Sequence, residues 1–180
     1  FHGPPERGGW HQLADADVDL LVTAAYGHRV PVEQLRIDTM INVHPSYLPH
    51  GRGPNPLVHI AGSADAREAA GVTIHLLDET FDTGPVLIQR RFEGSSKNPS
   101  LQDLTLWAMA VAPAMLNELL DDLDGHVALQ QRIASPPHGT ERSAPQRRRC
   151  PKTAPAINAT MRRSIVILIN RNMTVRRREN

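Results

Sequence analysis

The 180-residue sequence has little of several features that define whole classes of protein. It has one cysteine, Cys150, which excludes an internal disulfide framework and favours a reducing compartment such as the cytoplasm. Aromatic residues make up 4% of the chain, so aliphatic side chains must supply most of the core. No run approaches the roughly 18 apolar residues of a membrane span. The nine histidines show no paired metal-ligand spacing. We expect a cytoplasmic protein with no membrane partner and no metal.

Charge is distributed unevenly along the chain. Residues 1–131 hold 8 Lys and Arg against 17 Asp and Glu, whereas residues 132–180 hold 12 against 2. A split of this size marks two different kinds of segment. We predict a folded core over residues 1–131 and a basic segment over residues 132–180, whose first part is a linker rich in Pro, Arg and Ser.

Apolar runs and chain breakers predict an α/β fold for the core. The runs at residues 19–25, 40–44, 71–77 and 85–92 are typical of strands, and the first suits a strand that is buried on both faces. Strands mixed with helices favour a mostly parallel sheet. Helical turns are expected at residues 32–35 and 57–61. A long helix is expected at residues 101–123, kinked or split by Pro113 and ended by Gly125.

Three polar side chains are predicted at one edge of this sheet. Asn42 and His44 project from the same face near the end of a strand, and Asp82 follows the next strand in an acidic loop. Ligands of open α/β sheets bind at the carboxyl ends of strands. Acyl transfer to an amine needs such a set, because an amide N–H or an imidazole stabilises the oxyanion and a carboxylate takes up a proton. None of the three is a covalent nucleophile, which favours direct transfer.

Structural roles for these residues are also open at this point. A single Asn or His at a strand end commonly satisfies backbone groups, and Asp82 before Thr83-Gly84 can simply form a turn. His75 is more typical of a residue that packs within a strand than of a ligand. The basic segment lacks interleaved aromatic residues, so its arginines do not form a nucleic-acid motif.

The order of the motifs adds a further constraint. The segments are Asn42-Val43-His44-Pro45-Ser46-Tyr47-Leu48-Pro49, Arg52-Gly53-Pro54, Gly71-Val72-Thr73-Ile74-His75 and Asp78-Glu79-Thr80-Phe81-Asp82-Thr83-Gly84-Pro85. Together they resemble the 10-formyltetrahydrofolate-dependent formyltransferase family, over roughly residues 17–125. That family includes methionyl-tRNA, glycinamide ribonucleotide and sugar-amine formyltransferases and a formyltetrahydrofolate deformylase. The resemblance implies a Rossmann-like core with 10-formyltetrahydrofolate as co-substrate.

The resemblance also implies roles for individual residues. Asn42 and His44 would polarise the formyl oxygen, and Asp82 would manage protons through a water and keep His44 charged. Two loops would wrap the pterin ring largely through backbone groups, and Tyr47 replaces a leucine in the family's Ser-Leu-Leu-Pro motif. The residues implied in folate binding are Gly27, His28, Arg29, Val30, Ser46, Leu48, Pro49, Leu77, Asp78 and Glu79.

The acceptor is the least constrained part of this hypothesis. The loop Arg52-Gly53-Pro54-Asn55-Pro56 resembles that of the methionyl-tRNA type, so initiator methionyl-tRNA is the expected acceptor. A sugar-nucleotide amine or glycinamide ribonucleotide, a hydrolase and a non-catalytic fragment are the alternatives. The family's strands before Leu20 are not found, so we expect a sheet that is incomplete on its N-terminal side. Residues 143–145 and then 157–174 loosely resemble the linker and first helix that lead into the family's C-terminal domain. The basic segment either contacts tRNA phosphates or is a solvated linker.

Overall fold

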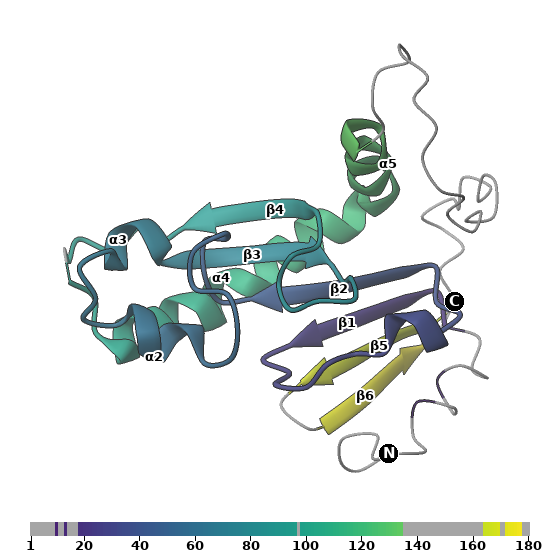
Figure 1. The fold of residues 1–180 in the computed structure, drawn as a ribbon, viewed down its shortest axis with the longest axis horizontal. Coiled ribbons are helices and arrows are strands. Elements are labelled where there is room, and N and C mark those ends of the chain that lie inside the picture. Colours follow the sequence, from purple (N-terminus) through teal and green to yellow (C-terminus); the bar gives the residue numbers. More distant parts are fainter. Residues whose placement is uncertain are drawn as a thin grey trace, which may run out of the picture.

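The structure is a computed structural model that describes residues 10, 13, 18–96, 98–134, 164–169 and 172–177. Within these residues, six strands form one sheet in the order β4-β3-β2-β1-β5-β6 (Figure 1). The strands are β1 (Leu20–Ala24), β2 (Thr39–His44), β3 (Gly71–Leu76), β4 (Val86–Arg91), β5 (Ser164–Ile169) and β6 (Asn172–Arg177).

The α/β class predicted from the sequence is confirmed, but the described sheet is mixed rather than mostly parallel. Strand β1 pairs in parallel with β2 and with β5. The pairs β2–β3, β3–β4 and β5–β6 are antiparallel. The nine residues between β3 and β4 are too few for the helical crossover that a parallel pair needs, so β4 returns beside β3 in the opposite direction.

Helix α4 (Leu101–Asp121) covers one face of the sheet, whereas the segment that carries η1 (Val32–Gln34) packs on the other face. Further helices are the short α2 (Pro56–Ile60) and α3 (Ala66–Ala69) and the longer α5 (Leu123–Ala134). Ser100 starts α4 with a capping box, in which its hydroxyl accepts from the Asp103 N–H and the Asp103 carboxylate accepts from the Ser100 N–H. No helix in the described part of the chain is long and apolar enough to cross a membrane.

The predicted split of the long helix at Pro113 and its predicted end at Gly125 are wrong. Helix α4 continues through Pro113, and the interruption comes at Asp122, whose φ of −140° is not helical. Gly125 therefore lies within α5 instead of ending the helix. Pro113 is exposed, and the side chain four residues earlier, Met109, is 70% exposed. Water can reach the carbonyl that loses its N–H partner on that outer surface, which makes the proline tolerable.

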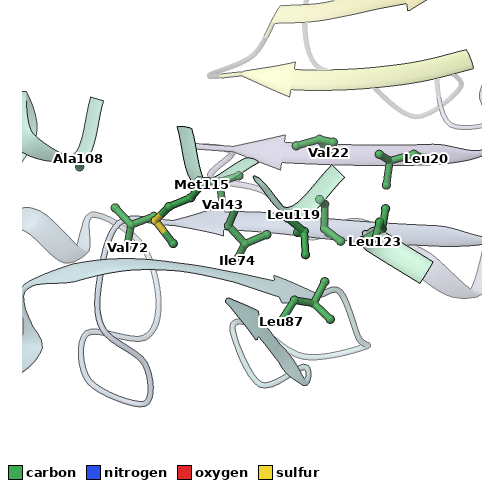
Figure 2. Close-up of a cluster of buried hydrophobic side chains, with 11 residues drawn as sticks. Leu20, Val22, Val43, Val72, Ile74, Leu87, Ala108, Met115, Leu119 and Leu123 are labelled. Carbon is green, nitrogen blue, oxygen red and sulfur yellow. The ribbon is translucent and has the colours of Figure 1, made fainter. Parts of the chain in front are cut away.

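The main core lies between α4 and the sheet. Alternate residues of the strands point to this side, as the period of two in a strand requires. Met115 and Leu119 of α4 are fully buried against them (Figure 2). The buried members of this cluster are Leu20, Val22, Ile41, Val43, Val72, Ile74, Leu87, Ala108, Met115, Leu119 and Leu123.

The basic segment contributes two strands to the same sheet. Strand β5 pairs with the edge of β1 that faces away from β2, in a register that joins Leu20 to Ile165 and Ala24 to Ile169. Its run of β-branched and apolar residues suits a strand, and Val166 is 1% exposed. The helix suggested by resemblance for residues 157–174 is thus wrong for 164–169 and 172–174. The predicted linker spans residues 132–156; its first three residues belong to α5, and residues 135–156 lie outside the described residues.

The second face of the sheet carries a smaller apolar cluster beside the polar residues discussed below. Leu21 and Val166 come from the sheet, and Val30, Leu35 and Ile37 come from the segment after β1. Because β5 covers the β1 edge, the edge that the sequence suggested would be incomplete is paired in the structure. Strands β5 and β6, which lie in the basic segment predicted over residues 132–180, belong to the same sheet as β1 to β4.

Candidate active site

Polar side chains form two rows across the face of the sheet that α4 does not cover. In the first row, Thr23 of β1 pairs with Asn42 of β2, and Asn42 pairs with His75 of β3. In the second row, His44 pairs with Thr73, and Thr73 pairs with Gln89 of β4. The same alternation that sends Val22, Val43 and Ile74 into the core therefore places polar residues side by side on the opposite face.

A cleft of about 630 Å³ opens over the first row. Its walls come from the ends of β1 and β2, from residues 25–30 and 53–58, from most of residues 77–82, and from Leu101. Thr23, Asn42, His44 and Asp82 all line it. Its volume falls within the roughly 300–1,000 Å³ typical of small-molecule sites.

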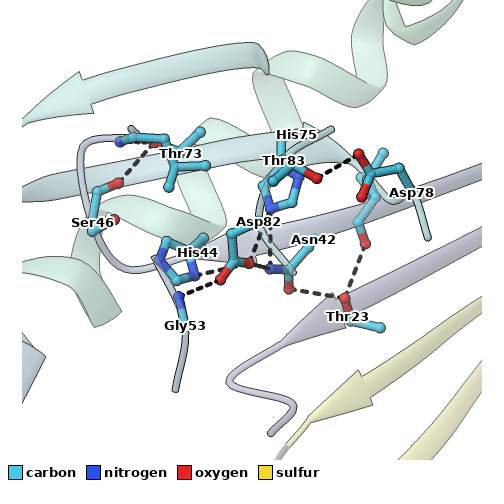
Figure 3. Close-up of polar contacts among 12 residues, drawn as sticks. Thr23, Asn42, His44, Ser46, Gly53, Thr73, His75, Asp78, Asp82 and Thr83 are labelled. Carbon is cyan, nitrogen blue, oxygen red and sulfur yellow. Dashed lines mark hydrogen bonds and ion pairs between the residues drawn. The ribbon is translucent and has the colours of Figure 1, made fainter. Parts of the chain in front are cut away.

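Asn42 lies at the centre of the polar contacts (Figure 3). Its amide oxygen accepts a hydrogen bond from the Thr23 hydroxyl at 2.9 Å. Its amide nitrogen lies 3.2 Å from Asp82 Oδ1 and 3.2 Å from His75 Nε2. An amide NH₂ has two hydrogens, so each of these acceptors can receive one. All the polar atoms of the Asn42 side chain thus have partners.

His44 and Asp82 form a buried pair beside Asn42. His44 is 4% exposed and Asp82 is 8% exposed. His44 Nε2 donates to the carbonyl oxygen of Gly51 at 2.8 Å, and His44 Nδ1 lies 3.4 Å from Asp82 Oδ1. The other carboxylate oxygen, Asp82 Oδ2, accepts from the backbone N–H of Gly53 at 2.8 Å. The loop at residues 51–53 therefore holds both members of the pair.

Burial and charge set the protonation of this pair. Burial lowers the pKa of His44 below its ordinary value of 6.5, and the opposing effects of Asp82 and the Gly51 carbonyl do not reverse it. Burial alone would raise the pKa of Asp82, but the neighbouring His75 and His44 rings and the Gly53 N–H hold it below its ordinary value. The lowered pKa of His44 favours its neutral ring, and the lowered pKa of Asp82 favours its ionised carboxylate. The charged His44 that the family resemblance implied stays a prediction.

His75 belongs to the site, although its position in a strand suggested only packing. It is 1% exposed, and its Nε2 lies 3.5 Å from Asp82 Oδ1. His75 Nδ1 lies 2.8 Å from the carbonyl oxygen of Leu76, which can only accept. The Nδ1 atom therefore carries the hydrogen and Nε2 accepts from Asn42. The register with Asn42 is the signal that reveals His75, and a sequence alone does not contain that register.

The acidic loop after β3 has a local structure that explains its motif. Asp78 accepts from the Thr80 N–H at 3.0 Å and from the Thr83 hydroxyl at 2.7 Å, and the two threonine hydroxyls contact each other. Asp82 adopts a left-handed conformation with φ of 54°. Gly84 passes so close to β3 that a Cβ atom there would lie 1.8 Å from the Leu76 carbonyl oxygen. The Asp-Thr-Gly sequence thus aims Asp82 at Asn42 and His44.

The structure places the other predicted residues in two groups. Gly27, His28, Arg29, Val30, Leu77 and Asp78 line the cleft, and Arg29 Nε donates to the Glu79 carbonyl at 3.1 Å, which ties the two loops together. Ser46, Leu48, Pro49 and Glu79 do not line it. Ser46 and Leu48 are buried beneath the loop, where the Ser46 hydroxyl donates to the His50 carbonyl. Their contribution is to the shape of the loop that carries Gly51 and Gly53.

The chemistry available in the cleft is that of hydrogen bonding and proton transfer. In the described part of the chain, no group of three or more His, Cys, Asp or Glu side chains could hold a metal ion. The cleft offers an oriented amide from Asn42 and the imidazole of His44, each within 3.5 Å of the Asp82 carboxylate. Such a set can stabilise an oxyanion and accept a proton.

Comparison with known proteins places these motifs in one family. Residues 7–105 match the family described as Formyl transferase. A methionyl-tRNA formyltransferase from Wolbachia pipientis subsp. Culex pipiens is 37% identical over 117 residues, which are 63% of this chain and 38% of that protein. The chain thus spans well under half the length of this curated relative.

Solved structures show the same similarity. Phosphoribosylglycinamide formyltransferase from Bacillus halodurans has 31% identity and a TM-score of 0.50, over 63% of this chain and 60% of that chain. A Mycobacterium tuberculosis protein whose inferred role is that of a sugar N-formyltransferase has 26% identity and a TM-score of 0.51, over 62% of this chain and 46% of that chain. The names of these relatives refer to different acceptors.

Proposed function

The chain belongs to the formyl transferase family, and from this premise we propose that it is the catalytic core of an enzyme that transfers a formyl group from 10-formyltetrahydrofolate to an amine. The observation that carries the proposal is the convergence of Asn42, His44 and Asp82 on one cleft, with Asp82 Oδ1 3.2 Å from the Asn42 amide nitrogen and 3.4 Å from His44 Nδ1. No covalent nucleophile is needed for this chemistry.

The cleft suits a folate ring system. Its wall beside Asn42 is made of two loops, residues 27–30 and 77–78, that offer backbone polar groups next to the apolar side chains of Val30 and Leu77. When bound, the folate supplies a formyl group that is activated for attack by an amine. The hydrogen bond from Arg29 to the Glu79 carbonyl holds these loops at a fixed separation, which favours a planar ligand between them.

Asn42 is the residue best placed to stabilise negative charge on the formyl oxygen. Its N–H groups lie at the cleft, and in the resting site they point to Asp82 and His75. A carbonyl oxygen that enters the cleft can take the place of His75 Nε2 as the acceptor of one amide hydrogen of Asn42. One such donor contributes about 100- to 1,000-fold in rate.

His44 and Asp82 are proposed to handle the proton that the amine loses. The neutral His44 ring has its Nδ1 lone pair available, since Nε2 donates to Gly51. After Nδ1 takes the proton, Asp82 Oδ1 at 3.4 Å stabilises the imidazolium. The same proton can then pass to the leaving nitrogen, so the transfer needs no net proton uptake. Asp82 thus stabilises a charge that His44 acquires during the reaction.

We propose methionyl-tRNA as the acceptor and the cytoplasm as the location. Methionyl-tRNA formyltransferases are among the relatives that match the chain, and residues 53–56 of the loop that resembles this type line the cleft. The structural relatives favour two other amines as competitors in a test, glycinamide ribonucleotide and a sugar-nucleotide amine. Each offers a primary amine to the same formyl-transfer centre.

One assay tests both the reaction and the acceptor. The protein is mixed with 10-formyltetrahydrofolate, and the release of tetrahydrofolate is followed with charged initiator methionyl-tRNA, with glycinamide ribonucleotide, with a sugar-nucleotide amine, and with no acceptor. We expect release with methionyl-tRNA alone. Release with another amine would keep the chemistry and change the acceptor. Release without an acceptor would indicate a hydrolase, and neither release nor folate binding would refute the proposal.

A further inference from the structure

We propose that Thr23 is a positioning residue whose hydroxyl fixes the orientation of the Asn42 side-chain amide. Neither the motifs nor the family similarity assign Thr23 a role. Its hydroxyl is next to Asn42 in the sheet register, it lines the cleft, and the residue is 2% exposed. The kinetic part of the proposal rests on the proposed formyl transfer, whereas the structural part stands on geometry alone.

The hydrogen bond geometry identifies the preferred partner of the hydroxyl. Thr23 Oγ1 lies 2.9 Å from Asn42 Oδ1 and 3.3 Å from the carbonyl oxygen of Ile41. A hydroxyl has one hydrogen, and the shorter contact is the better hydrogen bond. Asn42 Oδ1 is therefore held toward β1, and the two N–H groups of Asn42 must face the other way, toward Asp82 and His75.

Asn42 needs the Thr23 hydroxyl as a partner because the groups on the opposite side of its amide change during the reaction. In the resting site the ionised Asp82 and the His75 ring nitrogen also favour the observed orientation, because a flipped amide would turn its oxygen toward two acceptors. Those acceptors change when a carbonyl oxygen enters or when a proton moves onto the His44–Asp82 pair. Thr23 is buried and does not titrate in this range. It is the partner of Asn42 that stays constant while the cleft side changes.

The test compares two substitutions at Thr23 with a matched control. Thr23→Val keeps the shape of the side chain and removes the donor, whereas Thr23→Ser keeps the donor. The control is Thr39→Val, the same chemical change at another buried threonine of the sheet that lies outside the cleft. We expect Thr23→Val to lower kcat about tenfold, the order expected for one lost hydrogen bond, while KM for the folate changes little. Thr23→Ser should retain most turnover, and Thr39→Val should match the unaltered protein.

A second readout separates this proposal from the proposed function. The side-chain NH₂ signals of Asn42 are followed by NMR in the full chain, after assignment by their loss in Asn42→Ser. We expect them to shift in Thr23→Val and to stay in place in Thr39→Val. This measurement needs no turnover, so shifted signals support the positioning role even if no formyl transfer is detected.

Two results would overturn the proposal. Unchanged Asn42 signals in Thr23→Val would do so whatever happens to the rate. A raised KM with unchanged kcat would show that Thr23 is a wall of the cleft that contacts the ligand. Should Thr23→Val not fold, as judged by its melting temperature against that of Thr39→Val, Thr23→Ala removes the same donor with a smaller side chain and is judged by the same two readouts.

Discussion

The two faces of the sheet differ sharply in chemistry although the same strands build both. Toward α4, strands β1, β2 and β3 present aliphatic side chains such as Val22, Val43 and Ile74. Toward the cleft, the intervening positions hold Thr23, Asn42 and His75 in one hydrogen-bonded row. The aliphatic side chains on the α4 face need no hydrogen-bond partner. On the cleft face, each buried donor needs an acceptor.

This difference implies that stability and activity should respond to different substitutions. Core residues contribute through area removed from water and through close packing, which have little directional requirement. Site residues contribute through orientation, because each hydrogen bond needs its own angle and distance. A shift of one residue in the register of β2 would exchange the two faces, so the core also fixes which side chains reach the cleft.

The largest effect is expected on the cleft face, from Asp82→Asn. This change keeps the shape of the side chain and removes the charge that stabilises a protonated His44, so turnover should fall by about 100- to 10,000-fold. Folate should still bind, because the loops that surround it do not need the carboxylate charge. Turnover and folate affinity are measured together, with Asp65→Asn as the control in an exposed position. Equal rates for Asp82→Asn and the unaltered protein would remove Asp82 from the mechanism.

On the core face, Met115→Ala should reduce the free energy of unfolding by about 2–5 kcal/mol, measured by urea denaturation. Met115 is fully buried against the sheet, so the substitution leaves a cavity. Met109→Ala in the same helix is the matched control, because Met109 is 70% exposed, and its effect should be within about 0.5 kcal/mol. Similar losses for the two variants would mean that α4 does not pack as described.

The loop that carries Asp82 packs closely against β3 at Gly84. A methyl group at Gly84 would lie 1.8 Å from the Leu76 carbonyl oxygen, so Gly84→Ala must move the loop and with it Asp82. A displacement near 1 Å costs about 100-fold in turnover. Gly27→Ala is the comparison, since Gly27 also lines the cleft but has open space at its Cβ position. If both variants keep equal activity, the close packing of Gly84 does not position Asp82.

The smallest effect is expected from pH. The pKa of His44 in the folded protein is lowered by burial below its ordinary value of 6.5, so folding favours the neutral ring. The unfolded chain therefore binds more protons as the pH falls below 6.5, and the contribution of His44 to stability, complete above that pH, is lost on acidification. Melting temperatures between pH 7 and about pH 5 should fall less steeply in His44→Gln than in the exposed control His59→Gln. Parallel curves would contradict this.

Much of the site could be predicted from the sequence because its signals are local. Asn42 and His44 are two residues apart on a strand, so they share a face wherever that strand lies. Asp82-Thr83-Gly84 needs a left-handed residue and then a residue without a side chain, which is a property of the loop itself. These patterns place an amide, an imidazole and a carboxylate at strand ends without knowledge of the neighbours.

The rest could not be predicted because it depends on which strands become neighbours. Thr23 and His75 join the site only through their register with Asn42, and no local pattern contains that register. The helix expected near residues 157–174 is wrong, and the mixed direction of the sheet was missed, for the same reason: both depend on which strands pair. An apolar run such as Ser164–Ile169 suits several structures, and the free edge of β1 selects the strand.

The sequence by itself determined the alternation of apolar and polar residues along each strand, the local conformation of the Asp82 loop and the family that these motifs indicate. Only the tertiary structure decided that Thr23, Asn42 and His75 lie in one row, and that burial lowers the pKa of His44. The physical reason is that alternation and turn geometry are set by covalent neighbours, whereas register, burial and the pKa that follows from burial are set by residues distant in the chain.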